Sequence, residues 1–177
     1  MITVAVDVWW ADLRSADVER AAELPAAERA RLEELDASAD RGRRLLGALL
    51  LQEALRTARG LPQGAAVELD RTCETCGGPH GRPRPSDGLG PYVSVSHSGL
   101  LVAVAASYQA AVGVDVQRAS AAGRTWDWVV AEARFKAGLP EGAGSVLQLD
   151  PPLTGYTAAL TVAADDARVT FRGPSPG

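Results

Sequence analysis

Residues 92–116, which read YVSVSHSGLLVAVAASYQAAVGVDV, say most about the architecture of this chain. They contain three runs rich in valine and alanine, Tyr92–Ser96, Leu101–Ser107 and Ala111–Val116, separated by short turns. Runs of this length are typical of strands, and short connections between strands favour an antiparallel meander. We therefore expect three adjacent antiparallel strands in the middle of the chain.

The flanking segments predict a mixture of helices and further strands. Before the meander we expect a strand over Ile2–Trp9, short helices over Ser15–Leu24 and Ala26–Leu35, and a long helix capped by Ser38 or Asp40 that ends at Arg59 before Gly60. After it we expect a helix over Thr125–Ala137 and strands over Leu153–Ala163 and Arg168–Phe171. Antiparallel strands with helices packed on them indicate the α+β class.

Composition limits the classes of function. The chain has 177 residues, 46% of them hydrophobic, and a net charge of −4. This length suits one domain, or two small halves that share a core. The slightly acidic balance argues against nucleic-acid binding, which usually needs a basic excess. No apolar run reaches membrane-spanning length and no signal peptide is recognisable, so we predict a cytoplasmic protein without a membrane partner.

The segment Gly113–Gln117 suits a hard cation. Side chains alternate between the faces of a strand, so Asp115 and Gln117 point the same way. Their oxygens can hold Mg²⁺, which needs only one or two protein carboxylates when the phosphates of a substrate complete its shell. On pattern alone, a surface strand whose polar residues face water is the favoured alternative.

A second polar segment, Ser94–Gly99, lies at the end of the preceding strand. Its hydroxyls and the imidazole of His97 can donate hydrogen bonds to a phosphate. A serine hydrolase is disfavoured, because Ser96 and His97 point to opposite faces and no G-x-S-x-G elbow is present. Taken alone, His97 is more often a hydrogen-bonded structural histidine.

The third segment is the expected helix Thr125–Ala137. Trp128, Glu132 and Lys136 recur every four residues and therefore share one helix face. Lys136 is the only lysine in the chain. Glu132 and Lys136 can form an ordinary surface ion pair, or they can serve as a metal ligand or base and as a phosphate partner.

In this order, the three segments resemble the phosphopantetheinyl transferases of the surfactin-synthetase type. The motifs are Ser-His-Ser, Gly-Val-Asp-Val-Gln and Trp-x-x-x-Glu-Ala-x-x-Lys. Two earlier stretches agree: Arg43–Gly47 resembles the arginine-led helix that contacts coenzyme A, and Cys73–Pro83 resembles the family's Gly-Lys-Pro segment with its preceding cysteine pair. The likeness extends over residues 4–138.

The resemblance implies a fold, a reaction and partners. The fold would consist of two similar α/β halves, residues 1–107 and 108–177, related by a pseudo-twofold axis with coenzyme A between them. A serine of an acyl or peptidyl carrier protein would attack the β-phosphate of coenzyme A, and adenosine 3',5'-bisphosphate would leave. Mg²⁺ would stabilise the charge on the pyrophosphate. Members of this type usually act as monomers.

The resemblance also implies roles for individual residues. Asp115 and Glu132 would hold the magnesium, with Gln117 as a neutral or water-mediated ligand. Glu132, or a metal-bound water, would accept the proton of the carrier serine. The remaining residues would contact coenzyme A: Lys136 at the pyrophosphate, Arg82 in place of the Gly-Lys-Pro lysine, and Ser96, His97 and Arg43 at the phosphate end of the nucleotide.

Three departures from the family pattern keep a second interpretation open. Gln117 replaces a common glutamate, Ala131 replaces a common lysine, and the connection between Asp115 and Glu132 is less than half as long as the family's. A degenerate member that binds coenzyme A without efficient transfer would show such changes.

The cysteine pair gives a third hypothesis, from another class: a small binding or interaction module with a zinc knuckle. Cys73, Cys76 and His80 supply three ligands, whereas a structural zinc site takes four. The sequence therefore favours a simple turn here and leaves zinc as the alternative.

Overall fold

The computed structural model describes residues 3–119 and 126–173. Its helices are η1 (Leu13–Ser15), η2 (Val18–Glu23), α1 (Ala26–Glu33), α2 (Ser38–Arg59) and α3 (Trp126–Ala137). Its strands are β1 (Thr3–Asp12), β2 (Leu69–Asp70), β3 (Arg84–Pro85), β4 (Tyr92–Ser98), β5 (Leu101–Ser107), β6 (Val112–Arg118), β7 (Ser145–Leu149), β8 (Tyr156–Val162) and β9 (Asp166–Arg172). None of the helices within these ranges is both long and apolar enough to cross a membrane.

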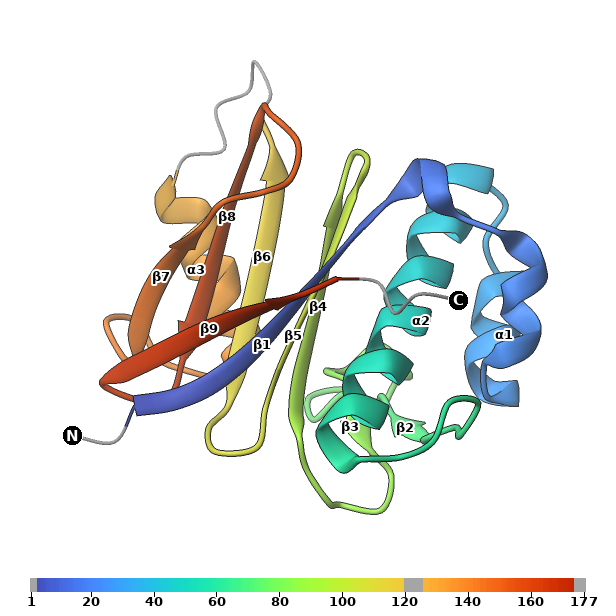
Figure 1. Cartoon of the computed structure of the whole chain (residues 1–177), viewed down its shortest axis with the longest axis horizontal. Coiled ribbons are helices and arrows are strands. Elements are labelled where there is room, and N and C mark those ends of the chain that lie inside the picture. The colour runs from blue at the N-terminus through green and yellow to red at the C-terminus, as the bar shows by residue number, and fades with distance from the viewer. Residues whose placement is uncertain (1–2, 120–125, 174–177) are drawn as a thin grey trace.

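Two sheets stand side by side, each covered by helix (Figure 1). The larger has the strand order β4-β5-β1-β9, and the smaller has the order β6-β8-β7. All pairs in them are antiparallel except β1–β9, which is parallel. Helix α2 packs on β5 and β4, and α3 packs on β6 and β8. The α+β class is therefore confirmed.

Strand β1 contributes to two cores because its residues alternate between faces. Val4, Val6 and Val8 pack between the two sheets, where they meet Val114 and other residues of the smaller sheet. Trp9 points the opposite way and joins the core beneath α2. The expected strand over Ile2–Trp9 is confirmed for the residues that the structure describes.

The expected three-stranded meander is only partly correct. Strands β4 and β5 form the antiparallel hairpin, but β6 leaves this sheet and pairs with β8. The serines of β4 explain the change. The backbone N–H groups of Val114, Val116 and Arg118 donate to the hydroxyls of Ser94, Ser96 and Ser98 at 3.0, 3.2 and 3.0 Å. Side chains thus satisfy one edge of β6, and its other edge is free to start a second sheet.

Helix α2 matches its expected range. Its buried face is rich in leucine, and Gly60 ends it in a left-handed conformation with φ of 63°. The predicted side-chain cap is wrong, because Ala37 occupies the N-cap position and Asp40 pairs with Arg43 instead. Gly47 brings the helix close to the sheet: a Cβ there would lie 3.2 Å from Val95.

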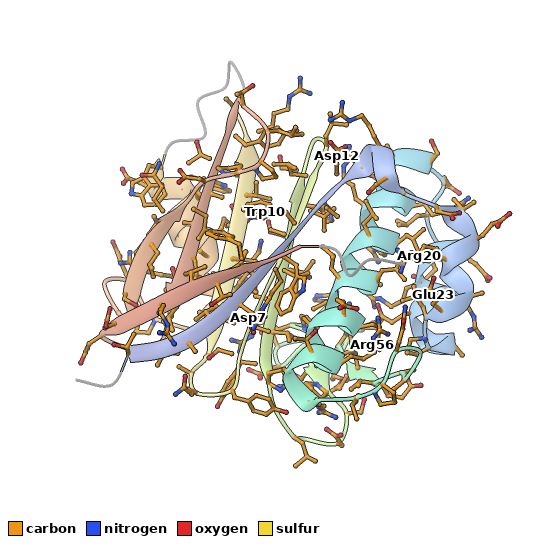
Figure 2. All side chains as sticks on the ribbon, in the orientation of Figure 1. Asp7, Trp10, Asp12, Arg20, Glu23 and Arg56 are labelled. Carbon is orange, nitrogen blue, oxygen red and sulfur yellow. The ribbon has the colours of Figure 1, made fainter. Side chains whose placement is uncertain are left out.

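Several smaller elements differ from expectation. Residues 18–23 form a 3-10 helix rather than a longer helix over Ser15–Leu24, with Asp17 as its cap. Arg20 and Glu23, labelled in Figure 2, form an ion pair of 2.7 Å on its surface. Strand β7 has no counterpart among the expected strands, and Thr125 lies outside the described residues.

The C-terminal strand links the predicted halves. Strand β9 comes from the segment 108–177 but pairs with β1 of the segment 1–107. The side chain of Arg172 donates to Asp7, labelled in Figure 2, at 3.0 Å and joins the two strands. The division into two halves with pseudo-twofold symmetry stays a prediction.

Candidate functional site

Asp115 on β6 contacts three other residues that were singled out in the sequence, Ser96, Gln117 and Lys136. One carboxylate oxygen, Oδ1, accepts hydrogen bonds from Ser96 Oγ at 2.8 Å and Lys136 Nζ at 2.7 Å. The other, Oδ2, accepts from Gln117 Nε2 at 3.0 Å. The expectation that Asp115 and Gln117 share a face is thus met. Only 1% of Asp115 is exposed, so we call this group the Asp115 cluster, a buried carboxylate with a cation as partner.

A glycine on β6 allows Lys136 to reach Asp115. A Cβ at Gly113 would lie 1.9 Å from the carbonyl oxygen of Ala133 and 2.5 Å from the backbone nitrogen of Ala137. Only glycine therefore lets α3 lie so close to the strand. At this separation the Lys136 ammonium also donates to the Val114 carbonyl at 3.3 Å.

The Asp115 cluster meets only part of what the expected magnesium ion requires. Mg²⁺ prefers oxygen ligands, and the carboxylates of Asp115 and Glu132 are of the right kind. In this arrangement, however, both oxygens of Asp115 accept hydrogen bonds, and the ammonium of Lys136 occupies the cation position beside Oδ1. Gln117 turns its N–H group, not its oxygen, toward the carboxylate. The side chains as placed do not fit a directly bound Mg²⁺.

Glu132 lies one helical turn before Lys136 on α3 and is half-buried. Within residues 3–119 and 126–173 it makes no hydrogen bond or ion pair. Of the two predicted acids, Asp115 is therefore occupied by donors and Glu132 is not, within the described residues.

The two predicted residues on β4 point to opposite faces. Ser96 is buried, donates to Asp115 and accepts from the N–H of Val116. His97 is exposed and lines a pocket against α2. As the sequence predicted, the two side chains do not form the serine–histidine pair of a hydrolase. The Ser96 hydroxyl already donates its proton to Asp115.

The pocket that contains His97 is rich in arginine. It has a volume of about 120 Å³ and lies between α1, α2, β4 and the segment after β2. We call it the arginine pocket; its polar lining consists of Arg31, Arg43, Arg44, Arg71 and His97. A pocket lined with several cations is a favourable environment for a phosphate.

Only part of this positive charge is neutralised. Arg71 forms two bonds to Glu28, at 2.8 and 3.1 Å, and Arg43 pairs with Asp40 at 2.6 Å. Arg31 gives one N–H to the Pro79 carbonyl, whereas its buried Nε has no partner within the described residues. Burial lowers the pKa of Arg31, and the neighbouring cations of Arg71 and Arg44 lower it further. An anion would relieve both the unpaired donor and the crowding.

His97 experiences the same surplus of charge. Desolvation lowers its pKa, and the cations of Arg43, Lys136 and Arg44 lower it further. These surroundings therefore disfavour the charged imidazolium, although the side chain reaches solvent. The cations of the arginine pocket and Lys136 thus act together across β4.

A larger cleft of about 630 Å³ lies beyond Lys136. Its lining includes Lys136, Arg82, Tyr92 and Tyr108. Arg82 rests against Gly138 at the end of α3, where a Cβ would lie 2.2 Å from its guanidinium. The structure therefore brings Arg82 and Lys136 to one cleft, and Arg43 and His97 to another pocket.

The loop over residues 87–90, which forms one wall of the larger cleft, is anchored to α2. Arg59 forms two bonds to Asp87, at 2.7 and 2.9 Å, and also donates to the Leu89 carbonyl. The bonds from Arg59 lower the pKa of Asp87 to about 2. This carboxylate therefore stays ionised near neutral pH and keeps the wall attached.

The cysteine pair and His80 come together in the loop after β2. The ligand atoms of Cys73, Cys76 and His80 all lie within 4.8 Å of one another. Backbone N–H groups of Cys76 and then Thr75 lower the pKa of the Cys73 thiol. The loop is thus more organised than the simple turn that the sequence favoured.

Two arginines of the arginine pocket had no sequence signal. Arg31 lies on α1 and Arg71 follows β2, and only the packing of these segments on α2 brings them to the pocket. In contrast, the spacing of Ser94, Ser96 and Ser98 at every second residue indicates a serine-lined strand face. This hydroxyl-lined face can be read from the sequence, but its contact with β6 cannot.

Neither the scan against protein-family models nor the search of curated proteins finds a match to this chain. The function is therefore inferred from the side chains of the site.

Proposed function

We propose that the protein is a phosphopantetheinyl transferase that binds coenzyme A and modifies a serine of an acyl or peptidyl carrier protein. The observation that carries the proposal is the arginine pocket next to the Asp115 cluster. One side of β4 offers unneutralised cations for a phosphate, and the other side offers a carboxylate and a lysine.

Coenzyme A suits the arginine pocket through its 3'-phosphate. Arginine binds phosphate oxygens bidentately, and four arginines with two paired carboxylates leave a positive surplus. His97 adds a further donor at the same site. The pocket is small, so it fits a phosphate group rather than a whole nucleotide, and the rest of the cofactor extends along the surface.

Lys136 and Arg82 are the partners proposed for the pyrophosphate. Both line the larger cleft, and 24% of the Lys136 side chain is exposed. The cleft is partly apolar, with Tyr92 and Tyr108 in its lining, so the pantetheine arm fits it as well.

Transfer requires a base and a leaving group. The carrier serine oxygen attacks the β-phosphorus, the bond from this phosphorus to the bridging oxygen breaks, and adenosine 3',5'-bisphosphate leaves. Glu132 is the proposed acceptor of the serine proton, because its carboxylate makes no bond among the described residues. Mg²⁺ is the cofactor that the resemblance implies, but the side chains around Asp115 as placed do not fit it. The charge on the pyrophosphate is therefore assigned to Lys136 and Arg82.

A second candidate function has its own supporting observation. Of the predicted metal ligands, Gln117 donates to Asp115, and Lys136 neutralises the Asp115 carboxylate. A protein that binds coenzyme A without efficient transfer would tolerate such a closed arrangement. Gln117 and Ala131 agree with this alternative.

The proposal is tested by incubating the purified protein with coenzyme A, an apo carrier protein and either Mg²⁺ or a chelator. Transfer appears as a mass increase of the carrier by one phosphopantetheine group. We expect Glu132→Gln to slow transfer at least about 100-fold without loss of coenzyme A binding. Asp127→Asn, an exposed acid on the same helix, is the matched control and should keep full activity.

The outcomes separate the two candidates. Magnesium-dependent transfer that Glu132→Gln abolishes supports the transferase. Binding of coenzyme A without any mass increase of several carriers favours the second candidate. Absence of coenzyme A binding contradicts both.

A further inference from the structure

We propose that Cys73, Cys76 and His80 form a zinc site that organises the loop between β2 and β3. Their three ligand atoms lie within 4.8 Å of one another, and Cys76 Sγ is 2.9 Å from His80 Nε2. No other group of three or more histidine, cysteine or acidic side chains within the described residues comes together in this way. The site is separate from the Asp115 cluster and from the arginine pocket.

The separations lie within about 1 Å of those in tetrahedral zinc coordination. With Zn–S of about 2.3 Å and Zn–N of about 2.0 Å, two sulfurs lie about 3.8 Å apart and a sulfur and a nitrogen about 3.6 Å apart. The ligands must therefore move by less than about 1 Å to enclose the ion. Two thiolates with one imidazole suit zinc better than magnesium or calcium, which prefer oxygen.

The backbone already holds the cysteines in a closed turn. The N–H of Gly77 donates to the Cys73 carbonyl at 2.9 Å, and the N–H of Cys73 donates to the Gly78 carbonyl at 2.8 Å. Gly77, directly after the second cysteine, has φ of 72°, which favours glycine. This geometry reduces the conformational entropy that metal binding must overcome.

Two further glycines place His80. A Cβ at Gly78 would lie 3.1 Å from the His80 ring. At Gly81 it would lie 2.5 Å from the Thr72 carbonyl oxygen, where the loop returns beside itself. The loop therefore has room for the imidazole only because these positions lack side chains. Cys76 and His80 are exposed, so the fourth position faces solvent and a water completes the tetrahedron.

The loop connects to both candidate binding regions. Glu74, between the cysteines, accepts from Arg84 at 2.7 Å and lies 3.7 Å from Arg82, which lines the larger cleft. The Pro79 carbonyl, just before His80, accepts from Arg31 of the arginine pocket. A zinc ion would fix these contacts; this role rests on the proposed function, whereas the metal site itself does not.

The test measures metal in untagged protein purified after growth with added zinc. We expect about one zinc ion per chain, and a loss of affinity of about tenfold or more in Cys73→Ser, Cys76→Ser and His80→Asn. The chain has two histidines, so His97→Asn is the matched control and should keep its zinc. Circular dichroism verifies that the variants remain folded.

Cobalt titration of the metal-free wild-type protein gives an independent answer. Binding at equimolar Co²⁺ with a thiolate-to-cobalt charge-transfer band supports the site. Wild-type protein that binds neither zinc nor cobalt stoichiometrically overturns the proposal, as does zinc that persists in all three ligand variants. Neither result bears on coenzyme A binding, so a failure here is distinct from a failure of the proposed function.

Discussion

The arginine pocket and the Asp115 cluster lie on opposite sides of β4. They differ in how far their charged side chains are neutralised within the protein. In the Asp115 cluster, one carboxylate has three donors from its own chain and is almost fully buried. In the arginine pocket, cations gather with too few carboxylates, and the buried Nε of Arg31 has no partner within the described residues. The first region is satisfied without a ligand, whereas the second is not.

The difference separates a stability role from a binding role. A buried ion pair that loses one partner leaves an unpaired charge, so residues of the Asp115 cluster should matter for folding. Crowded cations repel one another and gain from an anion, so residues of the arginine pocket should matter for ligand affinity. In the proposed transferase, Lys136 can bind the pyrophosphate only if it breaks its ion pair with Asp115.

The largest expected effect is on the stability contributed by the Asp115 cluster. Asp115→Ala leaves Lys136 and Ser96 without their partner and should lower the free energy of unfolding by about 3 kcal/mol, measured by urea denaturation. Asp127→Ala, an exposed acid on α3, should cost about 0.5 kcal/mol or less. Equal losses in the two variants would show that the Asp115 cluster has no special stabilising role.

The approach of α3 to β6 gives the next largest effect. Gly113→Ala places a methyl group against the backbone of Ala133 and Ala137, so α3 must shift away from the strand. We expect a loss of about 2 kcal/mol in the same measurement. The matched control is Gly142→Ala, at a loop position where a Cβ meets nothing within 4 Å but φ is 79°. A loss no larger than the strain seen in that control would contradict the close packing.

The pH dependence of the free energy of unfolding tests the lowered pKa of His97 in the arginine pocket. The folded-state pKa of His97 is lowered, so below about pH 6.5 the unfolded chain binds a proton that the folded chain does not. Stability should therefore fall as pH falls from that value to the lower folded pKa, and should not change from this cause above it. Urea denaturation at several pH values should show a shallower slope for His97→Asn. An unchanged slope would show that His97 does not cause it.

The smallest effect is expected at an exposed ion pair, which sets the baseline for both regions. Arg20 and Glu23 lie on the surface of η2 and are about half exposed (Figure 2). Arg20→Ala should change the free energy of unfolding by about 0.5 kcal/mol or less, because exposed pairs are screened by water and salt. A loss as large as that of Asp115→Ala would remove the distinction between buried and exposed pairs.

Local patterns predicted most of the elements, but among the strand pairs they predicted only β4 with β5. The apolar periodicity of α2 and its terminal Gly60 mark that helix in the sequence, and the valine-rich runs mark β4, β5 and β6. The departure of β6 into a second sheet depends on hydroxyl groups across a sheet boundary, which no propensity records.

The same limit applies to the candidate site. Asp115 and Gln117 share a face because strands alternate, and this follows from spacing alone. The binding of Lys136 to Asp115 depends on how closely α3 approaches Gly113, and the arginine pocket needs Arg31 and Arg71 from separate segments. These are tertiary contacts, so short-range sequence patterns do not contain them.

The most direct measurement compares the affinities of coenzyme A and 3'-dephospho-coenzyme A by calorimetry, for the wild-type protein and for Arg44→Ala. The arginine pocket predicts that the wild type binds coenzyme A at least about tenfold more tightly, and that Arg44→Ala loses most of this preference while its affinity for the dephosphorylated form is unchanged. Equal affinity of the wild-type protein for the two compounds would contradict the assignment of the arginine pocket to the 3'-phosphate.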